Sequence, residues 1–315
     1  MSIPARNMLE QDEDADRTDS VAALMHGFSV ETTPGAADKI ADYRAHLQPG
    51  TRVFVTFLAG SDFAHTERTA LRLAREGMHP VPHLAARSIP DRRFLEESLR
   101  RLSEEAGVRE ALVIAGAVGT PVGEFSDSMQ LLETGLFDRF GIRRIGVAGH
   151  PEGSPDIADD AIDRALQFKN AFARRSDAEL YVLTQFCFDA APIIAWERRL
   201  RAAGISLPLY IGLPGLATLG SLLAHAKACG VGPSMSFLTR QARNVARLMT
   251  VSAPDKLVCA LADYRASTPE CAIAGTHVYP LGGLRKSARW SYAVANGQLA
   301  LNVRGDGFRV DAELD

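Results

Sequence analysis

Short apolar runs alternate along this chain with longer amphipathic segments, and this alternation restricts the fold more than any other feature. Eight runs are predicted to be strands: Gly27–Glu31, Arg52–Leu58, Val81–Ala85, Ala111–Ala115, Arg144–Ala148, Leu180–Gln185, Leu207–Leu213 and Gly275–Leu281. Repeated strand–helix units indicate a parallel sheet covered by helices, and eight units favour a single α/β domain with a closed (β/α)8 TIM barrel. An open Rossmann-type sheet is the alternative, but no Gly-x-Gly-x-x-Gly follows the first strand.

Each of the first seven strands is followed by a predicted helix. These helices are Ala36–His46, Ala64–Arg75, Asp91–Ala106, Ser126–Arg139, Asp156–Arg174, Pro192–Ala203 and Leu216–Cys229. In Asp91–Ala106, Phe94, Leu95, Leu99 and Leu102 recur at helical spacing, and charged residues occupy the opposite face. Between the seventh and eighth strands we expect extra helices, an inserted pair at Met235–Met249 and Pro254–Ser267.

The two ends of the chain differ from this pattern. The first twenty residues are polar and acidic, so we expect residues 1–20 to form a disordered tail. The barrel then occupies residues 21–315, including a C-terminal extension. In that extension Trp290–Ala295 and Leu299–Val303 flank Asn296-Gly297, a dipeptide that favours a β-hairpin turn.

Composition excludes several classes of protein. Apolar residues make up 46% of the chain and charged residues 23%, with a net charge of −3, which is typical of a globular enzyme. No basic patch points to nucleic acid, and no run of eighteen apolar residues points to a membrane. The four cysteines form no Cys-x-x-Cys pair and suit neither a zinc site nor a disulfide framework. We therefore expect a cytoplasmic protein without a metal site.

Candidate site residues follow from the barrel, because side chains at the C-terminal ends of its strands face the active site. The strand ends carry Glu31, Thr56, His83, the run Ala115-Gly116-Ala117, His150, Gln185 and Tyr279. His83 and His150 are the only histidines that we expect at this rim.

Glu31 is the most informative of these residues. It has no Lys or Arg near it in the sequence, so we expect partial desolvation to raise its pKa and to suit it to general acid catalysis. A buried glutamate paired with a structural arginine is the alternative. His83 and Thr56 could equally be structural residues of the core. Gln185 lies among aromatic residues, where an unpaired buried amide costs about 1–3 kcal/mol, so it needs a ligand or a backbone partner.

The order of these segments resembles the methylenetetrahydrofolate reductase family, flavoenzymes with a (β/α)8 barrel. Ser29–Pro34 resembles the family's Phe-Glu-Phe-Phe-Pro-Pro segment, and Val81–Leu84 is similar to its Pro-His-Leu strand. Gly149–Asp156 resembles its Gly-Tyr-Pro-x-Gly-His-Pro-Glu loop, and Leu183–Asp189 its Ile-Thr-Gln-Phe-Phe-Phe-Asp segment. Weaker similarities at Ile211–Pro214 and His277–Leu281 extend the resemblance from about residue 26 to residue 285.

The resemblance implies reduction of 5,10-methylenetetrahydrofolate to 5-methyltetrahydrofolate, or the reverse oxidation, with NADH or NADPH and FAD. It makes Glu31 the general acid that helps open the imidazolidine ring. It implies that Gln185, Tyr279 and Leu281 bind the folate. The implied cofactor-binding residues are Thr56, His83, Ala115, Gly116, Ala117, Ser126, His150, Gln167 and Lys169. It also implies a homo-oligomer.

The chain departs from the family at several positions. Ala115, Gly116 and Ala117 stand where the family has Arg-Gly-Asp, which removes a flavin contact and an aspartate beside the flavin and folate. Ser154 replaces the loop histidine. After the seventh strand, Gly220 and Leu223 or Ala224 replace a glutamine and a phenylalanine. These departures favour two alternatives: a flavin-independent reductase, or a barrel that binds folate or another one-carbon carrier without redox chemistry. The sequence leaves the nicotinamide and the direction of reaction open.

Overall fold

The computed structural model describes residues 8–228, 251–311 and 314. Eight parallel strands close into a barrel in the order β1-β10-β7-β6-β5-β4-β3-β2, which confirms the predicted fold. These strands are β1 (Ser29–Thr32), β2 (Arg52–Val55), β3 (His79–Ala85), β4 (Glu110–Ile114), β5 (Arg144–Gly149), β6 (Glu179–Phe186), β7 (Leu209–Pro214) and β10 (Ile273–Tyr279). Two small antiparallel pairs lie outside the barrel: β8 (Ala217–Thr218) with β9 (Val251–Ser252), and β11 (Leu299–Leu301) with β12 (Phe308–Val310).

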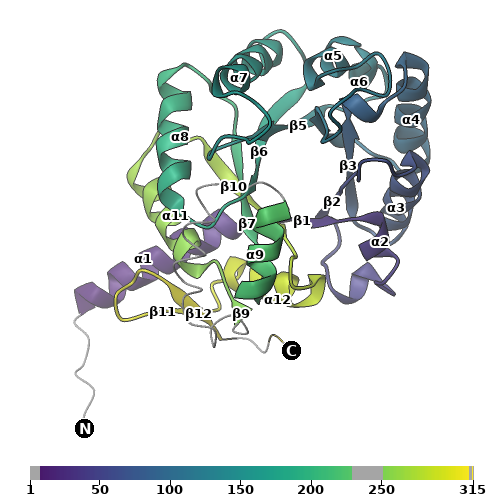
Figure 1. Ribbon diagram of the computed structural model, residues 1–315. Helices are drawn as coiled ribbons and strands as arrows, with labels where there is room; N and C mark the ends of the chain where they lie inside the picture. The colour runs from purple at the N-terminus through teal and green to yellow at the C-terminus, as the bar shows by residue number, and fades with distance from the viewer. Residues whose placement is uncertain (1–7, 229–250, 312–313, 315) are drawn as a thin grey trace.

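Helices surround the strands (Figure 1). They are α1 (Met8–Met25), α2 (Pro34–Ala37), α3 (Phe63–Arg75), α4 (Arg92–Glu105), α5 (Ser128–Glu133), α6 (Leu136–Arg139), α7 (Asp159–Ala173), α8 (Ala190–Ala202), α9 (Leu219–Ala228), α11 (Asp255–Ser267) and α12 (Leu284–Ala295). Short 3-10 turns occupy η1 (Tyr43–Ala45) and η2 (Ala86–Ser88). Among the described residues, no helix combines the length and the apolar character that a bilayer crossing requires.

Aspartates begin several helices that follow the strands. Asp62, Asp91, Asp127 and Asp189 are the N-caps of α3, α4, α5 and α8, and each side chain accepts a hydrogen bond from a backbone N–H of the first turn. Such caps satisfy donors that the helix itself leaves unpaired. The helices then bury one face against the strands, as Leu95, Leu99 and Leu102 of α4 do at 0–1% exposure.

The middle of the barrel is apolar. Alternate residues of each strand point inward, because side chains alternate between the two faces of a strand. The inward residues Phe54, Val81, Leu112, Tyr181 and Leu183 form one buried cluster, against which Ile114 and Tyr210 pack. The interior is therefore a packed core, and a reaction site has to lie beyond it.

Charged and aromatic side chains close the N-terminal end of the barrel. Arg144 donates hydrogen bonds of 2.8 Å to Glu110 and to the Tyr210 hydroxyl, and Tyr181 donates one of 2.7 Å to Glu110. Arg52 Nη1 lies 3.5 Å from Glu110 Oε1. Glu110 is thus a glutamate paired with two arginines at this floor. The alternative that Glu31 is paired with a structural arginine is not borne out, because Glu31 lies toward the opposite end and its contacts in the described residues are His277, Thr56 and His83.

The N-terminal tail is a correction to the sequence prediction. We expected disorder through residue 20, but Met8–Met25 form α1. Val21, Leu24 and Met25 are fully buried, and α1 packs against α11, α12 and β10. Arg17 also pairs with Asp263 of α11. Contacts with elements more than 200 residues away in the chain stabilise the helix, and composition alone does not reveal them.

Two predicted helices are interrupted. The segment Ala36–His46 contains only α2 and the η1 turn, which Asp42 begins by accepting a hydrogen bond from the Arg44 amide. The segment Ser126–Arg139 divides into α5 and α6 at Gly135, whose φ of 70° places it in the left-handed region that favours glycine. The other predicted helices in the described residues are present, and Met235–Met249 lies outside those residues.

The predicted hairpin around Asn296-Gly297 is wrong. Trp290–Ala295 belong to α12, and the turn ends that helix: Gly297 has a φ of 70°, and its amide donates to Val294 O. Glycine in this conformation is a common helix C-terminus as well as a hairpin signal. The hairpin forms one turn later, where β11 pairs with β12.

Candidate active site

Glu31 lies on the interior side of the barrel. Val30 and Thr32 pack outward, Val30 into the main core and Thr32 by a 2.9 Å hydrogen bond to the Tyr43 hydroxyl. Strand alternation therefore directs Ser29 and Glu31 inward together. The carboxyl side chain of Glu31 is only 11% exposed.

Three polar side chains from three neighbouring segments contact this carboxylate. His277 of β10 places Nε2 2.8 Å from Glu31 Oε2, and Thr56, just after β2, donates a hydrogen bond to Oε1. His83 of β3 has its Nε2 3.5 Å from Oε1. The structure thus brings together Glu31, Thr56 and His83, all of which the sequence had singled out.

The sequence predicted a raised pKa for Glu31, and the structure corrects this prediction. Burial does raise the pKa of this carboxyl group, but the nearby histidines and the hydrogen bonds from His277 and Thr56 outweigh it and hold the pKa below its ordinary value. Burial lowers the pKa of His83 despite the neighbouring Glu31 carboxylate. In this structure Glu31 is therefore a carboxylate at neutral pH.

Sequence reasoning missed His277 as a site residue. It is fully buried, and its Nδ1 lies 2.8 Å from the Ser29 hydroxyl oxygen. The strand register pairs Ser29 with His277 directly. A usable signal was present, since Ser29 and His277 lie two residues from the candidate residues Glu31 and Tyr279 and therefore share their inward faces.

His150 and Lys169 form a second polar group near the end of β5. Lys169 of α7 is 5% exposed, and burial lowers its pKa to about 8, with Asp127 partly offsetting this effect. Burial also lowers the pKa of His150, and the charge of Lys169 adds to that effect. No hydrogen bond or ion pair joins Lys169 to a residue of the described ranges. Gln167, by contrast, lies on the exposed side of α7.

Gln185 lies at the end of β6, and Tyr279 and Leu281 contact residues next to it in the chain. The strand register shifts between Leu183 and Phe186, so Gln185 lies in an irregularity where its Oε1 accepts a 3.1 Å hydrogen bond from the Phe186 amide. The Tyr279 hydroxyl donates a 3.1 Å hydrogen bond to the Thr184 carbonyl. Tyr279 and Leu281 pack against the aromatic cluster that contains Phe186.

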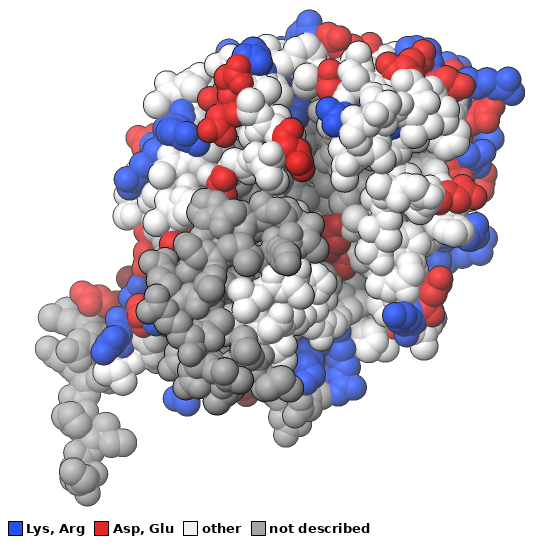
Figure 2. Space-filling model, viewed as in Figure 1, with Lys and Arg blue, Asp and Glu red and all other residues white. Residues whose placement is uncertain are grey.

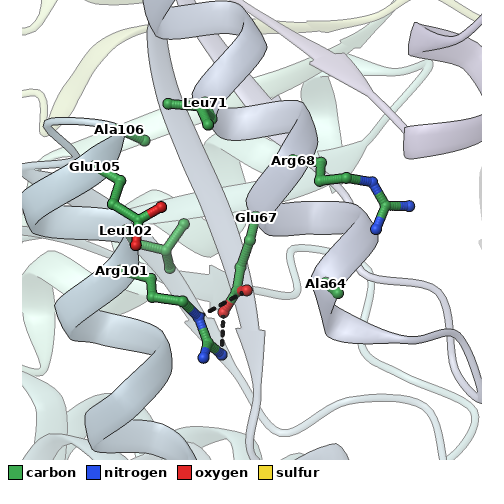
Figure 3. A pocket seen from close by; sticks show the side chains of 8 residues that line it. All are labelled: Ala64, Glu67, Arg68, Leu71, Arg101, Leu102, Glu105 and Ala106. Carbon is green, nitrogen blue, oxygen red and sulfur yellow. Dashed lines mark hydrogen bonds and ion pairs between the residues drawn. The ribbon is translucent and has the colours of Figure 1, made fainter.

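The face shown in Figure 2 is hollowed near the middle of the ring, with acidic side chains in the hollow and most basic ones at the outer edge. A separate groove of about 140 Å³ lies on the outside, between α3 and α4 (Figure 3). There Arg101 donates hydrogen bonds of 2.9 and 2.8 Å to the two oxygens of Glu67. This groove is remote from the strand ends, and its ion pair joins the two helices. Within residues 8–228 and 251–311, no three His, Cys, Asp or Glu side chains converge in a metal-binding arrangement.

Two yeast reductases are among the curated proteins that share sequence with this chain. Methylenetetrahydrofolate reductase 1 of Schizosaccharomyces pombe is 34% identical over 158 residues, which are 46% of this chain and 24% of that protein. Methylenetetrahydrofolate reductase 2 of Saccharomyces cerevisiae is 28% identical over 102 residues, 32% of this chain and 16% of that protein. Part of this chain is therefore similar in sequence to part of two methylenetetrahydrofolate reductases.

The sequence similarity covers only a small part of the two yeast reductases. The matched segments span a quarter or less of the two yeast reductases. No protein-family model matches the chain. A chitinase structure from Rhizomucor miehei aligns with 86% of this chain and 100% of that chain, but its TM-score of 0.37 and 8% identity are too low to support an argument.

The end of β4 is where this chain departs most from the family pattern that its sequence resembles. Ala115 and Gly116 are partly buried and Ala117 is exposed, so no charged side chain projects from this segment. A Cβ on Gly116 would lie 3.0 Å from Ala85 Cβ, so the glycine permits close packing of β4 against β3. Ser126, further along the same connection, is exposed and bonds to Gln130.

Proposed function

We propose that this chain reduces 5,10-methylenetetrahydrofolate to 5-methyltetrahydrofolate with NADH or NADPH, and that Glu31 is the general acid. The observation that carries the proposal is a mostly buried carboxylate toward the C-terminal end of the barrel that contacts two histidines and a threonine and has no arginine or lysine partner in the described residues. The sequence relation to the yeast reductases supplies the reaction class.

The reaction needs one proton and one hydride. Opening of the imidazolidine ring requires protonation of the departing ring nitrogen, and the hydride then reduces the methylene carbon. Glu31 is positioned for the proton because its carboxylate lies at an interior strand end, where the barrel fold places catalytic groups. A carboxylate that is held ionised has to acquire a proton before it can act.

Gln185 suits the pterin ring of the folate. Its side-chain oxygen is already bonded to the Phe186 amide, whereas its side-chain nitrogen has no hydrogen-bond partner among the described residues. Two free N–H donors match acceptor atoms at the edge of a pterin. The neighbouring ring of Tyr279, 5.4 Å from that of Phe186, offers an aromatic surface for the flat ring system.

The polar group at β5 fits part of an FAD molecule. Lys169 is a buried amine without a partner in the described residues, and a phosphate would compensate its charge. Thr56 and His83 would line the ring system, with His150 and Lys169 toward the phosphates. When bound, FAD would take a hydride from the reduced nicotinamide and pass it to the folate.

A flavin-independent reductase is the second candidate. It is favoured by one observation: the residues at Ala115 and Ala117 carry no charged group where the family resemblance places an arginine and an aspartate. In this case the nicotinamide would deliver its hydride to the folate directly. The proton chemistry of Glu31 is the same in both candidates.

An assay of reduced nicotinamide oxidation tests both candidates. The purified full-length protein is mixed with NADH or NADPH, with and without 5,10-methylenetetrahydrofolate, and with and without added FAD. Oxidation that requires the folate supports the proposal, and its dependence on FAD chooses between the two candidates. Tight folate binding with no oxidation under any condition would contradict both and support a non-redox folate-binding barrel.

A further inference from the structure

Glu31 has to gain the proton that the proposed reaction consumes, and the contacts around it indicate where that proton is held. Its pKa lies below the ordinary value because His83, His277 and Thr56 stabilise the ionised form. Glu31 alone is therefore a poor store of a proton at neutral pH.

Ser29, His277 and Glu31 form a continuous hydrogen-bonded line. Ser29 Oγ lies 2.8 Å from His277 Nδ1, and His277 Nε2 lies 2.8 Å from Glu31 Oε2. Ser29 is 1% exposed and His277 is fully buried, so solvent does not compete for these bonds. The two strands that carry them are adjacent, with Ser29 opposite His277 in the register.

This line accommodates two protonation states without movement of heavy atoms. When His277 is neutral, the Ser29 hydroxyl donates to Nδ1, and Nε2–H donates to Glu31. When His277 is an imidazolium, Nδ1–H donates and the Ser29 oxygen accepts after rotation of its hydrogen. A hydroxyl is both donor and acceptor, so Ser29 satisfies the imidazole in either state.

The other groups that contact Glu31 or His277 are less suited than His277 to hold the proton. His83 reaches Glu31 from β3, but burial lowers its pKa and favours its neutral form. Thr56 contacts the opposite carboxylate oxygen, Oε1, and brings no titratable group. The rings of Phe54 and Tyr279 lie 4.6 and 4.7 Å from the His277 ring.

We propose that His277 is the proton store of the site and Glu31 its outlet, with Ser29 as a positioning residue that holds the imidazole in either charge state. One proton moves. It leaves Nε2 of the imidazolium, reaches the Glu31 carboxylate, and is given by the resulting carboxylic acid to the departing nitrogen of an N–CH2–N substrate. His277 is left as its neutral Nδ1–H tautomer, whose N–H donates to the Ser29 oxygen, and Glu31 is left ionised. Solvent returns a proton to Nε2 of His277 through the Glu31 carboxylate, the more exposed end of the line. The inference rests on the proposed function for the identity of the substrate.

Nitrogen NMR of the histidine imidazoles tests whether His277 holds the proton, and it does so independently of turnover. We expect the imidazole nitrogen signals of His277 to depend on Glu31, because Nε2 lies 2.8 Å from the Glu31 carboxylate and Glu31→Gln removes that charged partner. Ser29→Ala should populate both neutral tautomers. His277→Gln identifies the resonance. The control His79→Gln removes an exposed histidine at the start of β3 and should change neither result. Identical His277 nitrogen signals in wild type and Glu31→Gln at every pH would overturn the proposal.

The pH dependence of kcat/KM provides a second, kinetic test of the proposal. Ser29→Ala, which removes one oxygen atom, should move the limb that reports the proton donor while leaving the KM for folate within about twofold. A profile that keeps its position and loses only amplitude would assign Ser29 and His277 a structural role. His277 signals that depend on Glu31, without folate-dependent turnover, would retain the relay and refute the proposed function, so the two failures are distinguishable.

Discussion

Replacement of Lys169 by methionine should stabilise the protein. Burial lowers the pKa of this amine from 10.5 to about 8, which means that the folded state disfavours the charged form. The difference between these values corresponds to about 3 kcal/mol, at about 1.4 kcal/mol for each pKa unit. Methionine has a similar length and carries no charge, so we expect Lys169→Met to raise the free energy of unfolding at pH 7 by about 1–3 kcal/mol.

The stability difference between Lys169→Met and wild type should depend on pH in a characteristic way. Between about pH 8 and 10.5 the unfolded wild-type chain binds more protons at Lys169 than the folded chain does, so wild-type stability rises with pH in this window. The advantage of Lys169→Met should therefore be largest below pH 8 and should disappear toward pH 10.5. Urea unfolding at a series of pH values measures it.

Two controls accompany the measurement. Lys39→Met changes an exposed lysine and should alter stability by less than about 0.5 kcal/mol. Lys169→Arg retains the buried charge and should give no gain. If Lys169→Met is no more stable than wild type at pH 7, or if its advantage is the same at every pH, the reasoning about the buried amine is refuted. If Lys169 also holds a cofactor phosphate, the stabilised variant should bind FAD more weakly.

Three further predictions concern the barrel itself. Gly149→Ala should destabilise the protein by about 1–3 kcal/mol in urea unfolding, because the new Cβ would lie 2.5 Å from Val182 Cγ1. A Cβ at Gly35 meets nothing within 4 Å, so the control Gly35→Ala should be nearly neutral. Glu197→Ala should cost about 3 kcal/mol in the same assay, because it leaves the Tyr264 hydroxyl and the Ala272 amide without their acceptor; an unchanged unfolding midpoint would contradict this. The free energy of unfolding should fall as pH drops below 6.5, because burial lowers the pKa of His83 and the unfolded chain then binds more protons than the folded chain. His83→Gln should reduce this pH dependence, and an unchanged slope of unfolding free energy against pH would refute the prediction.

The sequence predicted the barrel well because its strands and helices repeat a simple pattern. Every predicted strand of the barrel is present, with ends that differ by a few residues. The errors arose where distant contacts decide local structure. Residues 8–25 are helical because Val21, Leu24 and Met25 are buried against the C-terminal part of the chain. Asn296-Gly297 ends a helix because residues 290–295 pack as a helix face against the core.

For the candidate site, the sequence anticipated that Glu31, His83 and Thr56 lie close together, but it gave the wrong direction for the pKa of Glu31. Strand ends and the family resemblance together placed Glu31, His83 and Thr56 at one point, and the structure brings them into contact. The lowered pKa of Glu31 results first from the charge interaction with His83 and then from His277, which lies 246 residues further along the chain, and from Thr56. Barrel closure brings β10 beside β1, and the pairing of these strands sets which side chain meets Glu31. Without that register the sequence predicts a desolvated carboxyl group.

The most direct test of the account is the formation of 5-methyltetrahydrofolate by Glu31→Gln. Reduced nicotinamide and 5,10-methylenetetrahydrofolate are supplied to wild type, to Glu31→Gln and to the control Glu179→Gln, which changes an exposed glutamate at the start of β6. We predict that wild type and Glu179→Gln form the product at similar rates and that Glu31→Gln forms it about 100-fold or more slowly, since general acid catalysis contributes at least this much. A Glu31→Gln variant that forms the product at the wild-type rate would contradict the central claim.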